Sequence, residues 1–448
     1  MLARSWMVRK HCDGSMPCPV YPELTISFPV FLVTRSLLFG NTTTCGKVNS
    51  VYCITIMNQS DTQVVIIGGG PSGLLLSQLL NRSGIETIVL ERASRQHVLS
   101  RIRAGVLESG TVEMLRQAGV SERMDREGIP HHGCYMTDDD LMVRIDLKTL
   151  TGSSVLVYGQ TEVTTDLYAA QDSMGTTIHH NVSDVQPGDL EQARPYVDYS
   201  VNGQRNRINC NYIAGCDGYH GVSRQAIPAS KRREFERKYP FGWLGVLSET
   251  QPAHDEIVYA NSQFGFALAS MRNKHLSRYY IQVPMSEKVD DWSDERFWAA
   301  LKQRLPAQLA DSMNTGPSIE KSIAALRSFV CEPLRWGNLF LVGDAAHIVP
   351  PTGAKGLNLA VSDVYYLNNA LTSALRDGDS SGIDGYSERA LARIWRAMRF
   401  SWYLTNMMHS FDGEDNFAAQ MRKASLSHLS QSETARRELA ENYVGLPF

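Results

Sequence analysis

A short apolar run followed at once by a glycine-rich turn constrains the fold of this chain more than any other feature. The run Gln63–Ile67 is apolar and β-branched, as expected of a buried strand in a parallel sheet. The glycines of a GxGxxG pattern follow directly, at Gly68, Gly70 and Gly73. The apolar stretch Leu74–Leu80 then predicts a helix. This order of strand, glycine turn and helix predicts a Rossmann-like unit in an α/β fold.

Each part of this unit has a physical role in binding a dinucleotide. The first glycine allows a tight turn, the second lets the backbone approach a pyrophosphate, and the third lets helix and strand pack closely. The helix N-terminus, which includes Ser72, offers free N–H groups to the phosphates. A second predicted strand, Glu86–Leu90, ends at Glu91, where an acid would bind ribose hydroxyls. A GxGxxG alone can be no more than a turn, but this context predicts dinucleotide binding.

A second motif favours FAD over NAD as the dinucleotide. The run Leu339–Gly343 predicts another buried strand, and Asp344 follows at its carboxyl end, where we expect a helix to begin. An aspartate there can bind the ribitol or a ribose of a long cofactor. The sequence holds no second GxGxxG, which argues against a separate NADPH domain. We therefore expect FAD to stretch between these two distant segments.

The composition gives no sign of a nucleic-acid-binding protein or a metalloprotein. The chain has 448 residues, enough for two or three packed subdomains, and its formal net charge of -3 gives no reason to expect nucleic acid as a partner. Its eight cysteines include no CxxC pair, so we expect reduced thiols in a cytoplasmic enzyme and no metal site.

The first 56 residues differ from the rest in their scattered cysteines and prolines. Their one apolar run, Leu24–Val33, is too short to span a bilayer as a helix. We expect an extension that is disordered or spurious, a domain that begins near Met57, and no membrane partner.

From Met57 onward the chain resembles the p-hydroxybenzoate hydroxylase family of single-component FAD-dependent aromatic hydroxylases. The resemblance covers almost the whole domain and is carried by IIGGGPSGLLL, LSRIRAGVLE, VYGQTEVT, YIAGCDGYHGVSRQ, YPFGWLG, DDWSDERFW, RSFV, GDAAHIVPPTGAKGLNLA and AENYVGLP. It implies a Rossmann-like FAD-binding domain, a mixed β-sheet substrate domain, C-terminal helices and a homodimer. The expected segments are 57–235, with some substrate-domain strands, and 331–400 for the FAD-binding domain, 236–330 for the substrate sheet and 401–448 for the helical region.

The reaction implied by the resemblance is the conversion of 4-hydroxybenzoate to 3,4-dihydroxybenzoate. NAD(P)H reduces the flavin, O2 adds at flavin C4a, and the resulting hydroperoxide delivers OH to the ring carbon beside the phenol. The resemblance also implies cofactor contacts beyond the glycine turn. These fall at Arg101, Ile102, Arg103, Ala104, Gly105, Val106, Gln160, Asp344, Leu357 and Asn358.

The implied substrate contacts suit a ligand with a carboxylate at one end and a phenol at the other. Ser270, Met271 and Arg272 in LASMR, with Tyr280, match the family's carboxylate clamp, in which a guanidinium offers a planar two-donor fork. Tyr280 shares strand parity with Arg278 and Gln282, so one polar face of the sheet should line the site.

Activation of the phenol is implied to depend on Tyr259 and Tyr443. Electrophilic attack is faster on a phenolate than on a phenol, and hydrogen bonds to the charged form lower the phenol's pKa. A tyrosine chain can pass the proton outward, and the family's outlet matches His131. Taken alone, His131 would be expected at the surface. Pro351 matches a proline whose carbonyl contacts the substrate hydroxyl.

Five residues are candidates for the pyridine nucleotide: Arg92, Arg103, His220, Arg224 and Arg278. The segment 92–97 resembles the family's coenzyme-selecting helix, but Ala93 and His97 depart from its common NADPH pattern. We expect NADPH, with NADH possible.

Two alternatives stay open from the sequence. One is a related flavin hydroxylase of 3-hydroxybenzoate or 4-aminobenzoate. The other is a catalytically idle flavoprotein, which would be expected to have lost the tyrosines or Arg272.

Overall fold

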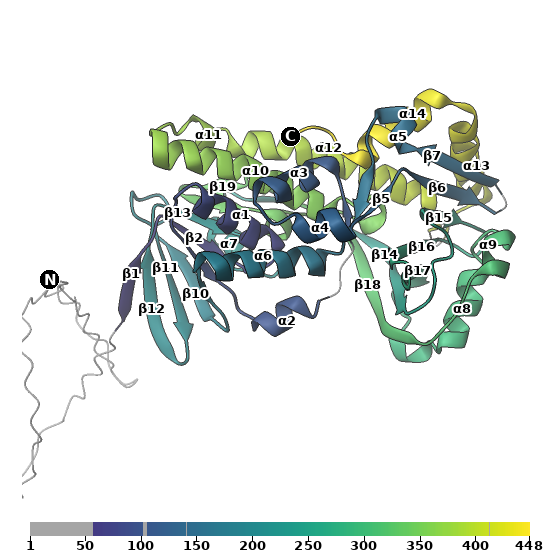
Figure 1. Cartoon of the computed structure of the whole chain (residues 1–448). Helices are drawn as coiled ribbons and strands as arrows, with labels where there is room; N and C mark the ends of the chain where they lie inside the picture. Colours follow the sequence, from purple (N-terminus) through teal and green to yellow (C-terminus); the bar gives the residue numbers. More distant parts are fainter. Residues whose placement is uncertain (1–56, 102–104, 140, 412) are drawn as a thin grey trace, which may run out of the picture.

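The computed structural model describes residues 57–101, 105–139, 141–411 and 413–448. The expected extension at 1–56 and the cofactor candidates Ile102, Arg103 and Ala104 lie outside the described residues. The described chain has a nucleotide-binding half and a β-rich half, joined by the long strands β14 (Arg233–Ser248) and β18 (Ser318–Glu332) (Figure 1).

The nucleotide-binding half is built on a six-stranded sheet of order β19-β20-β13-β2-β3-β9. Its strands are β2 (Val64–Ile67), β3 (Thr87–Leu90), β9 (Thr177–His179), β13 (Tyr212–Gly215), β19 (Arg335–Trp336) and β20 (Leu339–Leu341). All neighbours are parallel except β19 and β20. The expected strands on either side of the glycine turn, and the one before Asp344, are confirmed. Their apolar runs fit because both faces of this sheet are covered.

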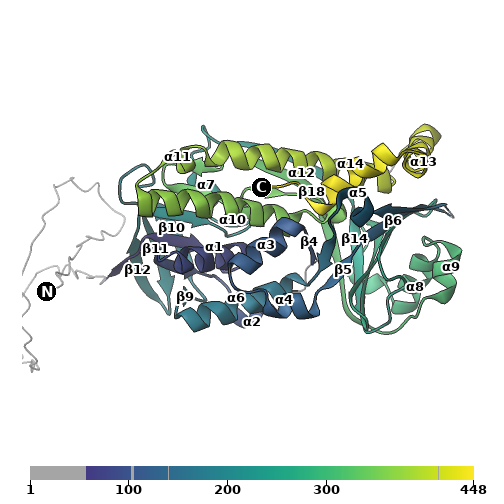
Figure 2. The same cartoon turned by 45° about the horizontal axis from the view of Figure 1, so that its top comes forward.

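Helices α1 (Pro71–Arg82), α6 (Gln160–Met174) and α10 (Gly356–Thr372) pack beside this sheet, and α10 contacts both α1 and α12 (Tyr386–Met408). Figure 2 shows α10 and α12 lying side by side. The predicted apolar face of α10 is confirmed, since Val364, Leu367 and Leu371 are fully buried. Two small sheets flank this half. Their strands are β1 (Asn58–Asp61), β10 (Ser183–Gly188), β11 (Tyr196–Val201) and β12 (Gln204–Asn209) in one, and β4 (Val106–Leu107), β5 (Ile129–His131) and β8 (Val155–Val157) in the other.

The β-rich half is an eight-stranded mixed sheet of order β21-β18-β14-β17-β16-β15-β6-β7. Its remaining strands are β6 (Gly133–Asp138), β7 (Leu141–Asp146), β15 (Ile257–Asn261), β16 (Ala267–Asn273), β17 (Leu276–Pro284) and β21 (His347–Ile348). Side chains alternate across the sheet and feed two cores. One core lies against α8 (Asp294–Lys302) and α9 (Ala307–Ser312), and the other against the C-terminal helices.

The C-terminal helices are α12, α13 (Asn416–Gln431) and α14 (Glu433–Val444). Because α12 is continuous from Tyr386 to Met408, the expected boundary at residue 400 falls inside a helix. The expectation that Asp344 opens an α-helix is wrong. A 3-10 turn, Gly343–Ala345, is followed by β21, because His347 and Ile348 pair with β18. Among the described residues, no helix is long and apolar enough to cross a bilayer.

Candidate active site

The glycine turn is shaped by close packing on two sides and left open on a third. A Cβ on Gly68, whose φ is +112°, would lie 2.2 Å from the carbonyl oxygen of Cys216. A Cβ on Gly73 would lie 2.0 Å from the Gly68 carbonyl oxygen. A Cβ on Gly70 would meet nothing within 4 Å, and Gly70 caps α1 without a side-chain hydrogen bond. The free N–H groups of α1 therefore face open space, as a bound pyrophosphate requires.

The two distant cofactor motifs come together beside this turn. Glu91 is buried at the end of β3, and its carboxylate accepts hydrogen bonds from Gly69 N and Ala93 N, both at 2.7 Å. A Cβ on Gly343 would lie 3.6 Å from Ser72 Oγ. Asp344, the next residue, is exposed. This juxtaposition fits one long cofactor held by both motifs.

Further along, the segment from Gly105 meets the starts of α6 and α10. A Cβ on Gly105 would lie 2.2 Å from the Tyr158 carbonyl, just before Gln160. Asn358 Nδ2 donates to the Val106 carbonyl at 2.9 Å, and Asn358 Oδ1 accepts from Glu108 N at 2.9 Å and from Thr111 at 2.7 Å. The side-chain amide of Asn358 is thus occupied within the protein, which leaves its backbone N–H for a cofactor. Leu357 is partly buried and Arg101 is exposed.

The predicted clamp residues share one face of the sheet, with one exception. Ser270 and Arg272 on β16 alternate with Met271, so Met271 points to the opposite face. Ser270 Oγ donates to the Arg278 carbonyl at 2.8 Å and must rotate to donate to a ligand. Arg272 Nε is enclosed and has no hydrogen-bond partner among the described residues. Burial lowers the pKa of Arg272, while Tyr280 opposes that shift. A partly buried guanidinium with an enclosed, unused donor is suited to an anionic ligand.

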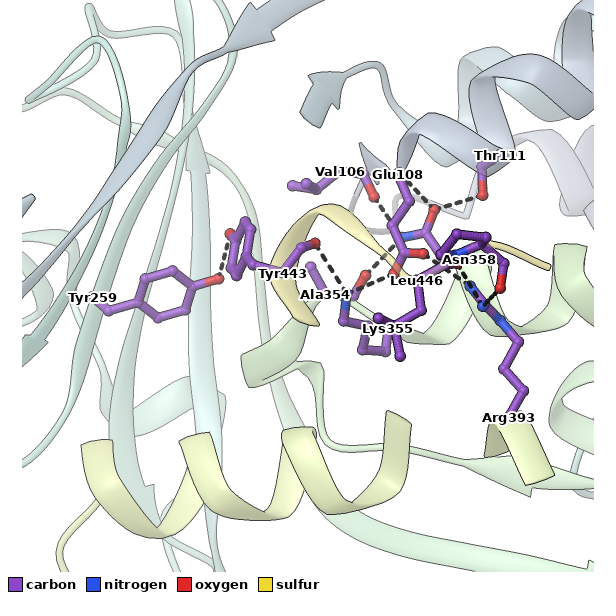
Figure 3. Close-up of polar contacts among 11 residues, drawn as sticks. Val106, Glu108, Thr111, Tyr259, Ala354, Lys355, Asn358, Arg393, Tyr443 and Leu446 are labelled. Atoms are coloured by element: carbon purple, nitrogen blue, oxygen red, sulfur yellow. Dashed lines mark hydrogen bonds and ion pairs between the residues drawn. The ribbon is translucent and has the colours of Figure 1, made fainter. Parts of the chain in front are cut away.

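The predicted tyrosine pair is present on the same face. The hydroxyls of Tyr259 on β15 and Tyr443 on α14 lie 2.9 Å apart, and each residue is only 2% exposed (Figure 3). Burial raises the pKa of both tyrosines above their ordinary values. Both hydroxyls therefore stay protonated at neutral pH and can donate as well as accept hydrogen bonds.

A buried charged cluster that the sequence analysis did not predict adjoins this tyrosine pair. Lys355 Nζ lies 2.6 Å from Glu108 Oε1 and donates to the Tyr443 carbonyl at 3.0 Å. Arg393 Nη2 lies 3.2 Å from Glu108 Oε2 (Figure 3). Burial lowers the pKa of Lys355, and Glu108 offsets part of that shift. Lys355 and Glu108 lie inside the motifs PPTGAKG and LSRIRAGVLE, so the sequence could have drawn attention to each residue. It could not have predicted that the two residues pair across 247 positions.

Comparison with known proteins agrees with this geometry. The FAD-binding-domain family model matches residues 61–401. A p-hydroxybenzoate hydroxylase of Acinetobacter baylyi is 51% identical over 393 residues, which cover 88% of this chain and 97% of the relative. The chain belongs to the p-hydroxybenzoate hydroxylase family of FAD-dependent aromatic hydroxylases.

More distant hydroxylases share the fold. A para-nitrophenol 4-monooxygenase of Pseudomonas sp. is 23% identical, with 72% of this chain and 81% of the relative covered. The crystal structure of a p-nitrophenol 4-monooxygenase of Pseudomonas putida superposes with a TM-score of 0.76 at 18% identity, and covers 88% of this chain and all of that one. As a member of this hydroxylase family, the protein uses FAD as its cofactor and NAD(P)H as its co-substrate for hydroxylation of an aromatic ring.

Within this hydroxylase fold, His131 is buried and Pro351 is exposed. His131, on β5, is 1% exposed, so the expectation of a surface histidine is wrong. Burial lowers its pKa, and neither ring nitrogen has a hydrogen-bond partner among the described residues. A neutral imidazole with free nitrogens can accept a proton. Pro351 is exposed, and its carbonyl accepts from Ala354 N at 2.9 Å with a second lone pair unassigned.

The candidates for the hydroxylase's pyridine nucleotide fall into two groups. Arg92 and His220 are exposed, whereas Arg224 and Arg278 are buried. The guanidinium of Arg224 is used within the protein, at 2.8 Å from the Tyr219 carbonyl and 3.2 Å from both the Ala345 carbonyl and a Glu234 oxygen. This arrangement favours a structural role for Arg224.

Proposed function

We propose that this hydroxylase converts 4-hydroxybenzoate to 3,4-dihydroxybenzoate. The proposal rests on two features found at one face of the sheet. Arg272 has an enclosed donor that is not used within the protein, and the hydroxyls of Tyr259 and Tyr443 lie 2.9 Å apart. The first suits a carboxylate and the second suits a phenol. The name of the Acinetobacter relative supports the same substrate.

At the carboxylate end, Arg272 supplies the charge and Ser270 and Tyr280 supply hydroxyls. Arg272 lies in a partly buried position, where a hydrogen-bonded ion pair is stronger than in water. Of the described residues, no carboxylate lies within ion-pair distance of Arg272. The ligand would therefore provide the counter-charge.

At the phenol end, Tyr259 would accept the substrate proton and pass one on through Tyr443. Proton transfer along such a chain needs donors and acceptors within hydrogen-bond distance, and the two hydroxyls meet that condition. His131 is our proposed outlet, because it is neutral and its nitrogens are free. Pro351 would orient the hydroxyl through its carbonyl. The cluster of Lys355, Glu108 and Arg393 holds two positive charges and one negative charge beside Tyr443, and this excess favours the anionic form of a nearby phenol.

FAD supplies the oxygen chemistry when bound, and several segments of this chain would hold it. The pyrophosphate would lie at the start of α1, against Gly70 and Ser72, and a ribose would lie at Glu91. The segment from Arg101 to Val106, with Gln160 and Asp344, would line its length. The α10 N-terminus at Leu357 and Asn358 would offer backbone N–H groups and positive partial charge to the reduced ring.

Coenzyme choice, assembly and location are also proposals. We expect NADPH in preference to NADH, because Arg92 is exposed on the segment that leads into α2 (Arg95–Leu99). Arg103 and His220 complete the proposed coenzyme contacts, whereas Arg278, like Arg224, is buried and paired within the protein. The family resemblance supports a homodimer, and the buried, unpaired cysteines of the described residues fit the reducing cytoplasm.

The test is product identification with purified protein, NADPH, O2 and three candidate acids. NADPH oxidation stimulated by 4-hydroxybenzoate, with 3,4-dihydroxybenzoate as product, would support the proposal. Turnover of 3-hydroxybenzoate or 4-aminobenzoate alone would reassign the substrate. Bound FAD without NADPH oxidation in the presence of any of the acids would indicate an idle flavoprotein.

A further inference from the structure

A second buried arginine lies beside the proposed carboxylate clamp, and it is already paired. Arg278 on β17 is 4% exposed, and its Nη1 lies 2.9 Å from Glu320 Oε2 on β18. Its Nη2 lies 3.3 Å from both Glu320 Oε1 and Ser322 Oγ. Burial alone would lower the pKa of Arg278, but Tyr280 and Glu320 outweigh burial and raise it. Arg278 is therefore a charged guanidinium with its own counter-ion.

This pairing crosses an intervening strand. In the sheet order, β14 lies between β17 and β18, so the two side chains start two strand spacings apart, roughly 10 Å. Gly245 on β14 pairs with Tyr280 on one side and Ser322 on the other. A Cβ on Gly245 would lie 2.9 Å from Arg278 Nη2 and 2.7 Å from Tyr280 Cε1. The missing side chain at Gly245 gives Arg278 room to reach β18.

The charges of this region then leave one cation for the ligand. Arg272 and Arg278 contribute two positive charges, and Glu320 neutralises that of Arg278. The Arg278 guanidinium also stacks on Tyr280, at 5.0 Å from the ring centre. Of the described residues, only Glu320 offers a carboxylate within ion-pair distance of either arginine. One unmatched guanidinium, that of Arg272, remains.

We propose that Glu320 is a specificity-determining residue, because its pairing with Arg278 across Gly245 limits the pocket to aromatic acids with a single carboxylate. This inference rests on the proposed function, in which Arg272 binds the ligand carboxylate. Glu320 is 30% exposed at its side chain, so solvent screens part of its effect. Removing its charge would nevertheless leave Arg278 buried and unmatched, ready to attract a second carboxylate.

The test is calorimetric titration of the FAD-bound protein with 4-hydroxybenzoate and with 4-hydroxyphthalate, which carries a second carboxylate beside the first. We expect wild-type protein to prefer the monocarboxylate. Glu320→Gln keeps the size and a hydrogen-bonding oxygen of the side chain but removes its charge. It should lower the ratio of the affinity for 4-hydroxybenzoate to the affinity for 4-hydroxyphthalate about tenfold, the effect of one nearby unit charge. The double variant Glu320→Gln/Arg278→Gln removes both charges and should restore the wild-type ratio.

The outcomes separate this inference from the proposed function. An unchanged ratio in Glu320→Gln, with the monocarboxylate still bound, would overturn the role of Glu320 alone. A double variant as permissive as Glu320→Gln would also overturn it, because the effect would not depend on Arg278. Wild-type protein that binds neither acid would overturn the proposed function, and this inference with it.

Discussion

Replacing Tyr259 by phenylalanine should separate NAD(P)H oxidation from hydroxylation. The change removes one hydroxyl and leaves the buried Tyr443 hydroxyl without its partner at 2.9 Å. A hydrogen bond to a charged group contributes about 1.5–3 kcal/mol. At 1.36 kcal/mol per unit, the pKa of the bound phenol should rise by about 1 to 2 units. The phenolate fraction at neutral pH would fall about ten- to a hundredfold.

The assay is product formed per NAD(P)H consumed, with hydrogen peroxide measured in parallel. Tyr259 has no proposed role in holding FAD, so substrate-stimulated NAD(P)H oxidation should persist. Product yield should fall below about one-tenth of the wild-type value, in proportion to the lost phenolate. An ultraviolet titration of the bound ligand would report the pKa rise directly. Tyr443→Phe should give the same change more weakly, because Tyr443 acts one hydrogen bond further from the ligand.

Tyr279→Phe is a matched control for this experiment. Its hydroxyl accepts a hydrogen bond from Ala253 N at 3.1 Å, and its ring packs in the core beside α8, on the far face of the sheet. It loses a buried hydroxyl without touching the proposed site. If Tyr259→Phe still couples NAD(P)H tightly to hydroxylation, the tyrosine pair is structural and the reasoning fails.

Three further changes test other parts of the structure. Arg272→Ala should weaken 4-hydroxybenzoate binding by about 2–5 kcal/mol without loss of FAD, measured by titration of the flavin spectrum, and unchanged affinity would show that the clamp is misassigned. Gly245→Ala should raise KM for the acid about tenfold, because overpacking against Tyr280 typically destabilises by about 1–3 kcal/mol. Gly242→Ala is the control, because its Cβ would fall on the other face of β14, and it should leave KM unchanged. Equal effects of the two changes on KM would point to general strain. A chain that starts at Met57 should bind FAD and remain fully active in steady-state assays, since every described element lies within it, and loss of FAD would refute this.

The sequence predicted those features that depend on neighbouring residues or on family motifs. The strands around the glycine turn and the apolar face of α10 follow from local periodicity, and the structure has both. The helix expected at Asp344 did not form, because His347 and Ile348 pair with a strand that is adjacent only in the folded chain. Local propensity cannot anticipate such a tertiary contact.

The candidate site shows the same division. Tyr259 and Tyr443 were identified by motif, and the structure brings their hydroxyls together. The pairing of Lys355 with Glu108 joins residues 247 positions apart, and the pairing of Arg278 with Glu320 depends on the missing side chain of Gly245 on the strand between theirs. Sequence patterns report periodicity along one chain segment, whereas these contacts depend on how distant segments pack together in the folded chain.

The position of Tyr443 on α14, far along the chain from Tyr259, bears on how the enzyme is made. Domains generally fold from the N-terminus as the chain is synthesised. The sheet that carries Tyr259 is complete by β21, whereas α14, which supplies the other hydroxyl, is synthesised after it. A chain that had bound cofactor before this helix docked would lack both Tyr443 and the carbonyl that accepts from Lys355. Biosynthesis would thus complete the proton path only after the parts that bind FAD, so a newly made molecule would release hydrogen peroxide until α14 has docked.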